Sequence, residues 1–313
     1  MAKLFLVVKS ARPRQWLKNL GVFSAIIFTG QLLEPVFLRL TLEAFISFCL
    51  ISSASYFLND LIDIQRDKLH PFKKLRPMAS GELDVKVAIV VMLGLMVASF
   101  FLAARITPAF FLTVIAYFLL QIAYSLYLKQ IPVIDILVIS AGFILRVFGG
   151  EVATGFHINI WLMLTVVSLS LFLAVGKRRS ELTLISNWEG TTPAKIRNVL
   201  GHYSQTLLDV YAAMFANAAW ITYALFAFLS PPLGARRSIA AFLLPFYPAG
   251  REWKWLMATI PVVIYGIMRY LQIIYEKKEG ESPEKVLLSD RPLMISVILW
   301  GLMVFAVIYI ISP

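Results

Sequence analysis

The chain has 313 residues, of which 59% are hydrophobic and 15% are charged, and its formal net charge is +11. This charged share lies well below the roughly 25% that is typical of a soluble globular domain, and a soluble chain of this length could not bury so much apolar surface. The composition therefore excludes an ordinary cytosolic enzyme, a disordered protein and a nucleic-acid-binding protein, so no nucleic acid is expected as a partner.

Long apolar runs recur along the chain, and a transmembrane helix needs about 20 such residues. Nine segments qualify: 17–33, 40–59, 85–104, 109–128, 131–150, 158–176, 207–229, 255–275 and 293–312. The runs are continuous and lack the alternation of a membrane barrel. We therefore predict an all-α integral membrane protein with nine transmembrane helices, forming a single polytopic domain over residues 1–313 in a lipid bilayer.

The distribution of basic residues predicts the orientation of these helices. With nine spans, 21 of the 29 Lys and Arg residues fall on the side of the N-terminus and six on the opposite side. Short cytoplasmic loops of membrane proteins carry such an excess. We expect a multi-pass protein of the plasma membrane with its N-terminus in the cytoplasm and its C-terminus outside.

The first polar feature stands at the start of the first predicted span, where Lys18 and Asn19 follow Trp16. Polar groups inside a span are costly and tend to be functional. A Trp flanked by cations is equally the usual interface anchor. Lys18 is therefore a candidate substrate ligand, with anchoring as the alternative.

The second predicted span leads into an acidic motif. Asp60, Asp63 and Asp67 are spaced i, i+3, i+7, and Asn59 precedes them, so on a helix all four share one face. Carboxylates that lie so close together repel one another unless a cation lies among them. Oxygen ligands favour Mg²⁺, which bridges them to substrate phosphates. The motif predicts Mg²⁺ ligands at all four positions and a catalytic role for the three aspartates; the alternative is a solvated helix end.

A basic segment follows the acidic motif. Lys73 and Arg76 lie close enough in sequence to neutralise phosphate charge at the metal. We predict that both contact substrate phosphate, although part of this positive charge reflects the usual excess of basic residues in cytoplasmic loops.

Further along, Arg146 lies inside a predicted span and needs a partner or a water-filled cavity, so it is either a structural pair or a substrate ligand. Gly149 and Gly150 after it permit close helix packing.

A second polar cluster lies at the end of the sixth predicted span, within Gly176–Leu182. Lys177 and Glu181 are spaced i, i+4 and face the same way. The alternative is a membrane helix end whose basic side chains reach the interface. We predict that Lys177 and Arg178 bind phosphate and that Glu181 accepts from sugar hydroxyls or orients a cation.

The motifs at 59–67, 70–81 and 124–129 together resemble the UbiA superfamily of intramembrane prenyltransferases. The resemblance implies nine helices around a central cavity, with Mg²⁺ and a diphosphate at its cytoplasmic mouth. It also implies that Tyr124 and Lys129, in the third motif, bind substrate.

One departure from the superfamily pattern narrows the resemblance. Typical members carry a second Asp-rich motif where this chain has Lys177, Arg178 and Arg179. With its N-terminal segment 12–19, this chain resembles a branch that transfers 5-phosphoribose from phosphoribosyl pyrophosphate to a polyprenyl (decaprenyl-type) phosphate. That branch releases pyrophosphate and supplies arabinose donors for the cell wall. Lys18, Arg76 and Arg146 are then candidates for the lipid phosphate.

Two other functions stay open at this point. An aromatic prenyltransferase of the same fold would use a prenyl diphosphate donor, and would be expected to carry the second acidic motif. A transporter would use the acids as a cation path, but would place its ionisable residues at mid-membrane depth. The sequence also leaves open whether the chain forms a homo-oligomer.

Overall fold

The computed structural model describes residues 2–69, 73–186, 198–230, 254–277 and 283–311, and within these ranges the regular structure is entirely helical. Eight helical segments are long and apolar enough to cross a membrane. They are Pro35–Ile62, Val85–Ala104, Pro108–Leu126, Ile134–Thr154, Ile160–Leu184, Gln205–Leu229, Trp255–Glu276 and Arg291–Ile311. They confirm eight of the nine predicted spans, so the chain is a multi-pass membrane protein.

The first predicted span, 17–33, is not one long helix, so the count of nine is not confirmed. The segment consists of the 3₁₀ helix η1 (Pro13–Phe23) and the short helix α2 (Ser24–Phe28), followed by a turn with Gly30 at φ 75°. Irregular backbone at membrane depth is tolerated where protein surrounds it. Asn19 and Val22 of η1 are indeed fully buried.

The described chain forms two compact units. The first unit comprises Met1–Ile26, Glu34–Phe156 and Thr191–His202. The second unit comprises Ile27–Leu33, His157–Gly190 and Tyr203–Pro313. The single polytopic domain over 1–313 stays a prediction.

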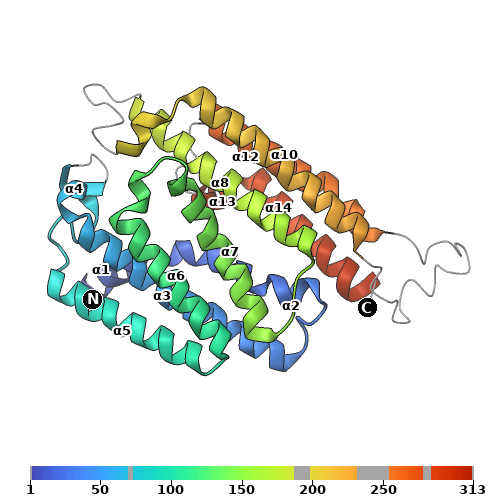
Figure 1. The fold of residues 1–313 in the computed structure, drawn as a ribbon, viewed down its shortest axis with the longest axis horizontal. Helices are drawn as coiled ribbons and strands as arrows, with labels where there is room; N and C mark the ends of the chain where they lie inside the picture. The colour runs from blue at the N-terminus through green and yellow to red at the C-terminus, as the bar shows by residue number, and fades with distance from the viewer. Residues whose placement is uncertain (1, 70–72, 187–197, 231–253, 278–282, 312–313) are drawn as a thin grey trace, which may run out of the picture. The chain divides into compact units, whose positions relative to one another are not determined.

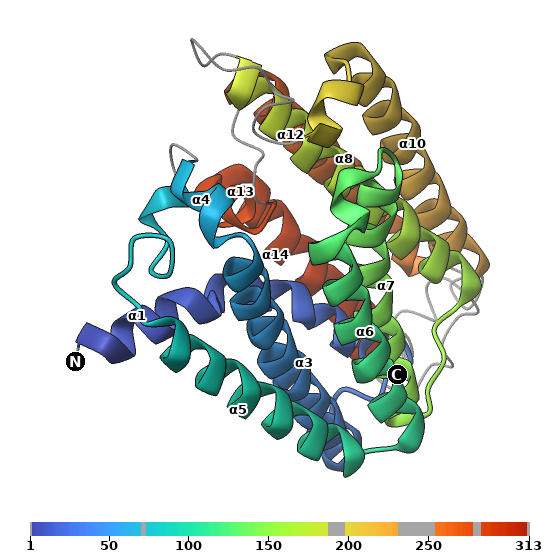
Figure 2. The ribbon, with the colours of Figure 1, turned by 60° about the vertical axis from the view of Figure 1, so that its left-hand side comes forward.

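The first unit is built on a long central helix, α3 (Pro35–Ile62), which lies beside α5 (Figures 1 and 2). Its other elements are α1 (Ala2–Ala11), η1, α4 (Ile64–Leu69), η2 (Lys73–Leu75), α5 (Val85–Ala104), α6 (Pro108–Leu126), η3 (Leu128–Gln130), α7 (Ile134–Thr154) and η4 (Asn198–His202). Local sequence sets several ends. The Asp84 and Thr107 side chains accept from backbone N–H groups at the starts of α5 and α6. Gly155, at φ 79°, ends α7.

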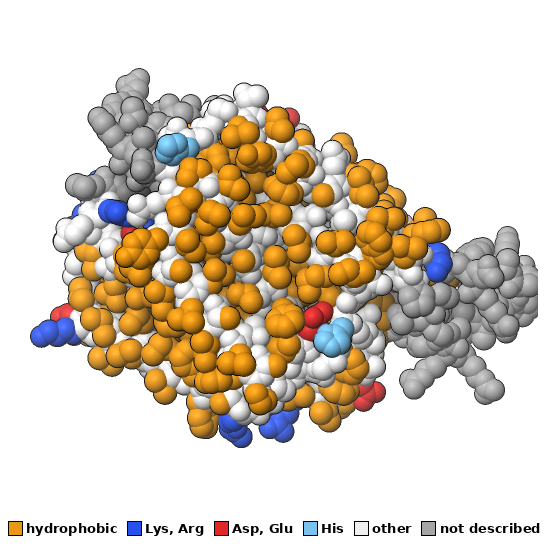
Figure 3. Space-filling model, in the orientation of Figure 1, with side chains coloured by type: hydrophobic (Ala, Val, Ile, Leu, Met, Phe, Trp, Pro, Cys, Tyr) orange, Lys and Arg blue, Asp and Glu red, His pale blue; other side chains and the backbone are white. Residues whose placement is uncertain are grey.

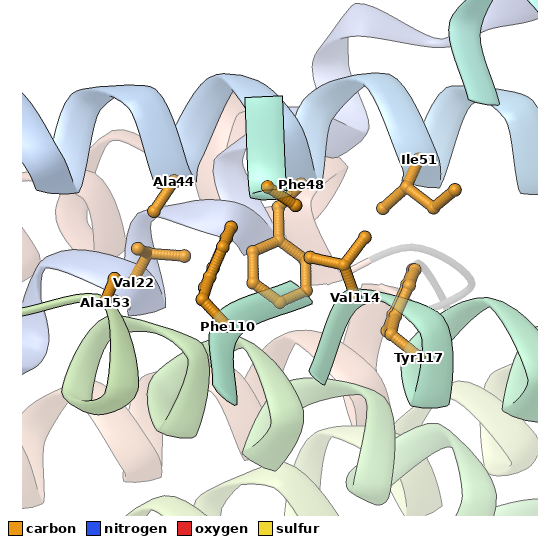
Figure 4. Packing of buried hydrophobic residues seen from close by; sticks show 9 residues of the cluster. Val22, Ala44, Phe48, Ile51, Phe110, Val114, Tyr117 and Ala153 are labelled. Atoms are coloured by element: carbon orange, nitrogen blue, oxygen red, sulfur yellow. The ribbon is translucent and has the colours of Figure 1, made fainter. Parts of the chain in front are cut away.

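The core of the first unit is a cluster of apolar side chains from η1, α3, α5, α6 and α7, in which Phe48 packs against Phe110 and Tyr117 (Figure 4). The predicted close packing at the glycine pair is confirmed. A Cβ on Gly150 would lie 2.0 Å from the Val22 carbonyl oxygen, and one on Gly149 would lie 2.5 Å from the Phe48 ring. Close packing of α7 against η1 and α3 therefore depends on these glycines.

The second unit contains the remaining long helices. They and their extensions are α8 (Ile160–Ser186), α10 (Gln205–Leu229), η6 (Trp255–Thr259), α12 (Ile260–Gln272), the π-helical turn η7 (Ile273–Lys277), α13 (Pro283–Ser289), α14 (Arg291–Phe305) and the π-helical turn η8 (Ala306–Ile311). Its core joins α10, η6 and α14 through Tyr223, whose hydroxyl lies 2.6 Å from Thr259 Oγ1 and accepts from Trp300 Nε1 (2.8 Å). Asp290 caps α14.

Large apolar side chains remain exposed along the outer helices. On α5, Val90, Val97 and Phe101 are 69%, 62% and 62% exposed, and their i, i+7, i+11 spacing places them on one face. Hydrophobic side chains also cover much of the described surface on the face shown in Figure 3. Such surfaces suit a lipid environment.

Candidate active site

The acidic motif does not form the unbroken helix that the sequence predicts. Helix α3 ends at Ile62, Asp63 has φ −93° and ψ 7°, and α4 begins at Ile64. Hydrogen bonds from Asp63 N to Asn59 O (3.0 Å) and from Asp67 N to Asp63 O (2.8 Å) carry the chain across this junction. The helical spacing is largely kept, but the junction falls on the middle aspartate.

Asp60 and Asp67, on either side of the junction, share one basic partner. Nη1 of Arg76 lies 3.1 Å from Asp60 Oδ1 and 2.6 Å from Asp67 Oδ2. Both aspartates are almost fully buried, at 3% and 4% exposure. Charge-assisted hydrogen bonds of this kind are the strong ones in a protein interior. The structure therefore brings together three residues that the sequence predicts for the site.

Asp63 has a different partner. Nζ of Lys129, in η3, lies 2.7 Å from both carboxylate oxygens of Asp63. Arg66 is more remote, with Nη1 3.9 Å from Asp63 Oδ1 and a side chain that is 67% exposed. The three acids are thus divided between two sets of partners, and their convergence on one ion stays a prediction.

Arg12 joins this site, and the sequence analysis missed it. Its Nη2 atom lies 2.5 Å from Asp60 Oδ1, and its guanidinium stacks on the Tyr56 ring at 5.0 Å from the centroid. Arg12 adopts a left-handed conformation (φ 53°, ψ 61°) between α1 and η1, which is strained for a residue with a side chain. The signal that could have found it is a cation directly before Pro13, where α1 must end.

The pKa of the Asp67 carboxyl is raised above its ordinary value. Burial is the main cause, because it disfavours the charged form, and the nearby Asp60 carboxylate adds to it. Arg76 and Lys73 oppose this shift by favouring the charged form. Lys73 therefore acts on Asp67 electrostatically, as its predicted place beside the acidic motif requires.

The donor chemistry at Asp60 and Asp67 fits a divalent cation, because these two buried carboxylates already hold a cationic nitrogen between them. The other two predicted ligands have their own partners. Asn59 Oδ1 accepts from Ser125 Oγ (3.2 Å), and Asp63 is bound by Lys129. In the ranges that the structure describes, no group of three or more His, Cys, Asp or Glu residues is arranged to hold a metal. Asp60 and Asp67 are the two acids that share a cation in this structure, and the full set of four metal ligands stays a prediction.

Other predicted residues of the first unit lie around this site. Lys18 Nζ donates to Gln15 Oε1 (2.5 Å), and the same oxygen lies 3.5 Å from the Tyr56 hydroxyl. The ring of Tyr56 is the one on which Arg12 stacks. Tyr124 lies on α6 directly before Ser125, the partner of Asn59. His70 of the 70–81 motif lies outside the described residues.

Arg146 has only neutral partners among the interactions that the described residues show. It donates to Asn19 Oδ1 (2.6 Å), the Tyr117 hydroxyl (2.7 Å) and the Gly142 carbonyl, and it is 4% exposed. It also stacks on the Tyr117 ring at 4.7 Å. These contacts tie η1, α6 and α7 together, so the structural role predicted for Arg146 is present.

The second polar cluster lies in the second unit, at the end of α8. Glu181 accepts from Nη1 of Arg178, an i, i+3 pair, and Arg178 is fully buried. Lys177 precedes this pair on the same helix. Gly176 allows the close approach of neighbouring side chains, since a Cβ there would lie 2.8 Å from Ile274 and 3.2 Å from Tyr270.

Arg179 is held by residues that the sequence analysis did not single out. Its Nε lies 2.5 Å from Asp209 Oδ1 on α10, and its guanidinium stacks on Tyr275 at 3.8 Å. Tyr275 belongs to the π-helical turn η7, a kind of distortion often found near functional sites. Arg179 therefore fastens α8 to α10 and η7, while Lys177 and Arg178 remain the candidates for substrate phosphate.

Comparison with known proteins gives a consistent result. The model of the UbiA prenyltransferase family matches residues 21–298. The chain is 33% identical to the decaprenyl-phosphate phosphoribosyltransferase of Corynebacterium glutamicum, over 97% of this chain and 87% of that protein. It is 34% identical to the enzyme of the same name from Mycolicibacterium smegmatis, over 97% of this chain and 92% of that protein.

Solved structures show the same fold. A UbiA homolog from Archaeoglobus fulgidus bound to GPP and Mg²⁺ matches with a TM-score of 0.69 at 20% identity, over 97% of this chain and 100% of that one. The apo structure of a UbiA homolog from Aeropyrum pernix K1 matches with a TM-score of 0.56 at 14% identity, over 96% and 98%. At these identities the likeness concerns the fold alone.

Proposed function

This chain belongs to the UbiA prenyltransferase family, and we propose that it transfers 5-phosphoribose from phosphoribosyl pyrophosphate to a decaprenyl-type polyprenyl phosphate, releasing pyrophosphate. The relatives named for this activity align with 97% of the chain. The product, a polyprenyl-phosphoryl-5-phosphoribose, would serve the synthesis of arabinose donors for the cell wall.

The observation that carries this proposal is the pair of different charged clusters. In the first unit, acids and bases are balanced around Asp60, as suits a pyrophosphate held with a metal. The second unit has Lys177, Arg178 and Arg179 where typical members have a second acidic motif. Phosphoribosyl pyrophosphate needs both environments, because it has a phosphate on C5 besides its pyrophosphate.

Mg²⁺ bound at Asp60 and Asp67, with Asn59 and Asp63 near it, would offset the negative charge of the pyrophosphate leaving group. Lys73, Arg76 and Lys129 supply further positive charge beside these acids. Their place next to buried carboxylates means that they can orient a polyanion. Tyr124 would line the same site.

Lys177 and Arg178 would bind the 5-phosphate, and Glu181 would accept from a ribose hydroxyl. Glu181 already accepts from Arg178, so the carboxylate also fixes the direction of that guanidinium.

The acceptor oxygen belongs to a lipid phosphate and is already anionic, so the reaction needs no general base. It would attack C1 of the ribose as the bond from C1 to the pyrophosphate oxygen breaks, and in-line attack inverts the configuration at C1. Lys18 and Arg146 are the proposed ligands of the lipid phosphate. Support for Arg146 comes from its buried positive charge, whose described contacts are neutral.

We also propose that the site faces the cytoplasm from the plasma membrane. The bias of basic residues toward one side of the membrane supports this orientation, and phosphoribosyl pyrophosphate, a water-soluble polyanion, would reach the site from that side. The lipid tail would leave sideways between helices into the bilayer.

The second candidate is transfer of a prenyl group from prenyl diphosphate to an aromatic or other small acceptor. It is favoured by the solved UbiA homologs bound to GPP or DMAPP together with Mg²⁺. The basic cluster at Lys177 argues against it, because a prenyl diphosphate has no second phosphate for these cations to bind.

One assay separates the two candidates. Purified protein in detergent with added lipid is supplied with Mg²⁺, polyprenyl phosphate and phosphoribosyl pyrophosphate labelled in the ribose. A labelled lipid is expected, and its formation should require the polyprenyl phosphate. If label enters a product only from prenyl diphosphate and an aromatic acceptor, the proposed donor is wrong.

A further inference from the structure

One nitrogen atom of Arg76 lies between two of the carboxylates that we propose as metal ligands. Nη1 lies 3.1 Å from Asp60 Oδ1 and 2.6 Å from Asp67 Oδ2, and in the described part of the chain these are the only ion pairs of Arg76. Arg12 and Lys129, by contrast, each pair with one aspartate. Within the described ranges, Arg76 is thus the residue that pairs with both acids flanking the helix junction.

Among the described residues, the pairs at 3.1 Å or less form a formally neutral cluster, and Arg66 lies further away, at 3.9 Å from Asp63. Three carboxylates face three cations at 3.1 Å or less: Asp60, Asp63, Asp67, Arg12, Arg76 and Lys129. A bare divalent ion would add two positive charges among buried groups, and burying uncompensated charge is unfavourable. A divalent ion that arrives with pyrophosphate brings its own negative charge.

The backbone of Arg76 is held by hydrogen bonds, whereas its side chain is partly exposed. Its N–H donates to Lys73 O (3.0 Å), and its carbonyl accepts from Ser80 N (2.8 Å). The following Met78 is buried against Phe57. The side chain is nevertheless 23% exposed, so solvent reaches it while the turn that carries it is fixed.

We propose that Arg76 is a resident counter-cation, displaced from Asp60 and Asp67 when a divalent metal and pyrophosphate enter together. Its guanidinium then turns to the pyrophosphate, whose oxygens match its planar fork. Metal and pyrophosphate therefore bind with positive coupling, and the free protein has little affinity for the metal alone. This inference rests on the proposed function only in requiring a donor that carries pyrophosphate.

The test measures metal binding rather than transfer. The full chain in detergent is dialysed against fixed free Mn²⁺, with and without inorganic pyrophosphate, and the protein-bound Mn²⁺ is counted. For the natural sequence we expect weak binding of Mn²⁺ alone and at least tenfold tighter binding with pyrophosphate, within the usual range of coupling between ligands. By reciprocity, Mn²⁺ should tighten pyrophosphate binding by the same factor.

Two variants assign the coupling to Arg76. Arg76→Gln should raise the affinity for Mn²⁺ alone by about tenfold and should reduce the enhancement by pyrophosphate. Arg66→Gln is the matched control, because it also removes one positive charge near the acidic motif. Arg66 is 67% exposed, and its Nη1 atom lies 3.9 Å from Asp63 Oδ1. It should bind Mn²⁺ as the natural sequence does.

Equal Mn²⁺ binding with and without pyrophosphate in the natural sequence would overturn the proposal, even if Arg76→Gln did not fold. The proposal would also be overturned if Arg66→Gln changed the affinity for Mn²⁺ as much as Arg76→Gln does, since that would show a general effect of charge. Inorganic pyrophosphate is common to both candidate donors, so an error in the proposed donor would appear only in the transfer assay. A failure here would leave the choice of donor unaffected.

Discussion

The acidic cluster of the first unit and the basic cluster of the second unit are held together in different ways. At the acidic cluster, Asp60 and Asp63 are bound by Arg12 and Lys129, which lie 48 and 66 residues away in the chain. At the basic cluster, Arg178 pairs with Glu181 only three residues along the same helix.

The two clusters also differ in how their charges are paired. Among the described residues, the acidic cluster joins Asp60, Asp63 and Asp67 to Arg12, Arg76 and Lys129, whereas the basic cluster joins Arg178 and Arg179 to one acid each, Glu181 and Asp209. Under the proposed function, the first cluster exchanges an internal cation for an external one, while the second binds an anion.

The largest effect is expected from Asp60→Asn. Removing this carboxylate takes away an acid of the proposed metal site and leaves Arg12 and Arg76 without their shared partner. We expect kcat for label transfer to fall by about 10³-fold, as when a group that stabilises transition-state charge is lost. Glu43→Gln is the control, because Glu43 also pairs with an arginine, Arg39, on an exposed part of α3. Equal loss in both variants would contradict a local role for Asp60.

A thermodynamic contrast comes from Lys129→Met. The change removes the ammonium group that donates to both oxygens of the Asp63 carboxylate, which is 15% exposed. We expect a loss of about 2 kcal/mol of stability, somewhat less than for breaking a fully buried pair, read as a lower melting temperature in detergent. Adding Asp63→Asn should restore part of this loss. Strict additivity of the two changes would show that the pair contributes nothing.

A smaller effect, at the basic cluster, is expected from Lys177→Ala. If this cation binds the 5-phosphate, its loss should raise KM for phosphoribosyl pyrophosphate by about tenfold, the value of one charged hydrogen bond, with little change in kcat. Initial rates at varied donor and fixed lipid give this result. A rise in KM for the lipid alone would show that the two phosphates are assigned to the wrong clusters.

Much of this organisation could be predicted from the sequence, because it depends on local patterns. Apolar length gave eight of the spans, and the spacing of Asp60, Asp63 and Asp67 marked the acidic cluster. The broken first span was missed, because hydropathy does not report that buried Asn19 accepts a hydrogen bond from Arg146, which lies on a helix far away in the sequence. The partners of the acids were missed for the same reason: nothing local links Arg12 to Asp60.

The basic cluster shows the same limit on a single helix. The i, i+4 spacing predicts that Lys177 and Glu181 face the same way, and Arg178, which precedes Glu181 by three residues, pairs with it. Asp209, the partner of Arg179, lies on another helix and carries no motif. Spacing thus identifies which residues are near one another but not which of them pair.

The smallest effect is expected from Arg66→Gln, which tests whether contact or mere proximity matters at the acidic cluster. Arg66 is 67% exposed and 3.9 Å from Asp63, whereas Lys129 lies at 2.7 Å and is 10% exposed. Exposed pairs are screened by water and salt, so stability should change by less than about 0.5 kcal/mol and transfer by less than about twofold. Melting temperatures at low and high salt, beside those of Lys129→Met, decide the matter. A loss comparable to that of Lys129→Met would mean that the net charge near Asp63, rather than the buried contact, stabilises the cluster.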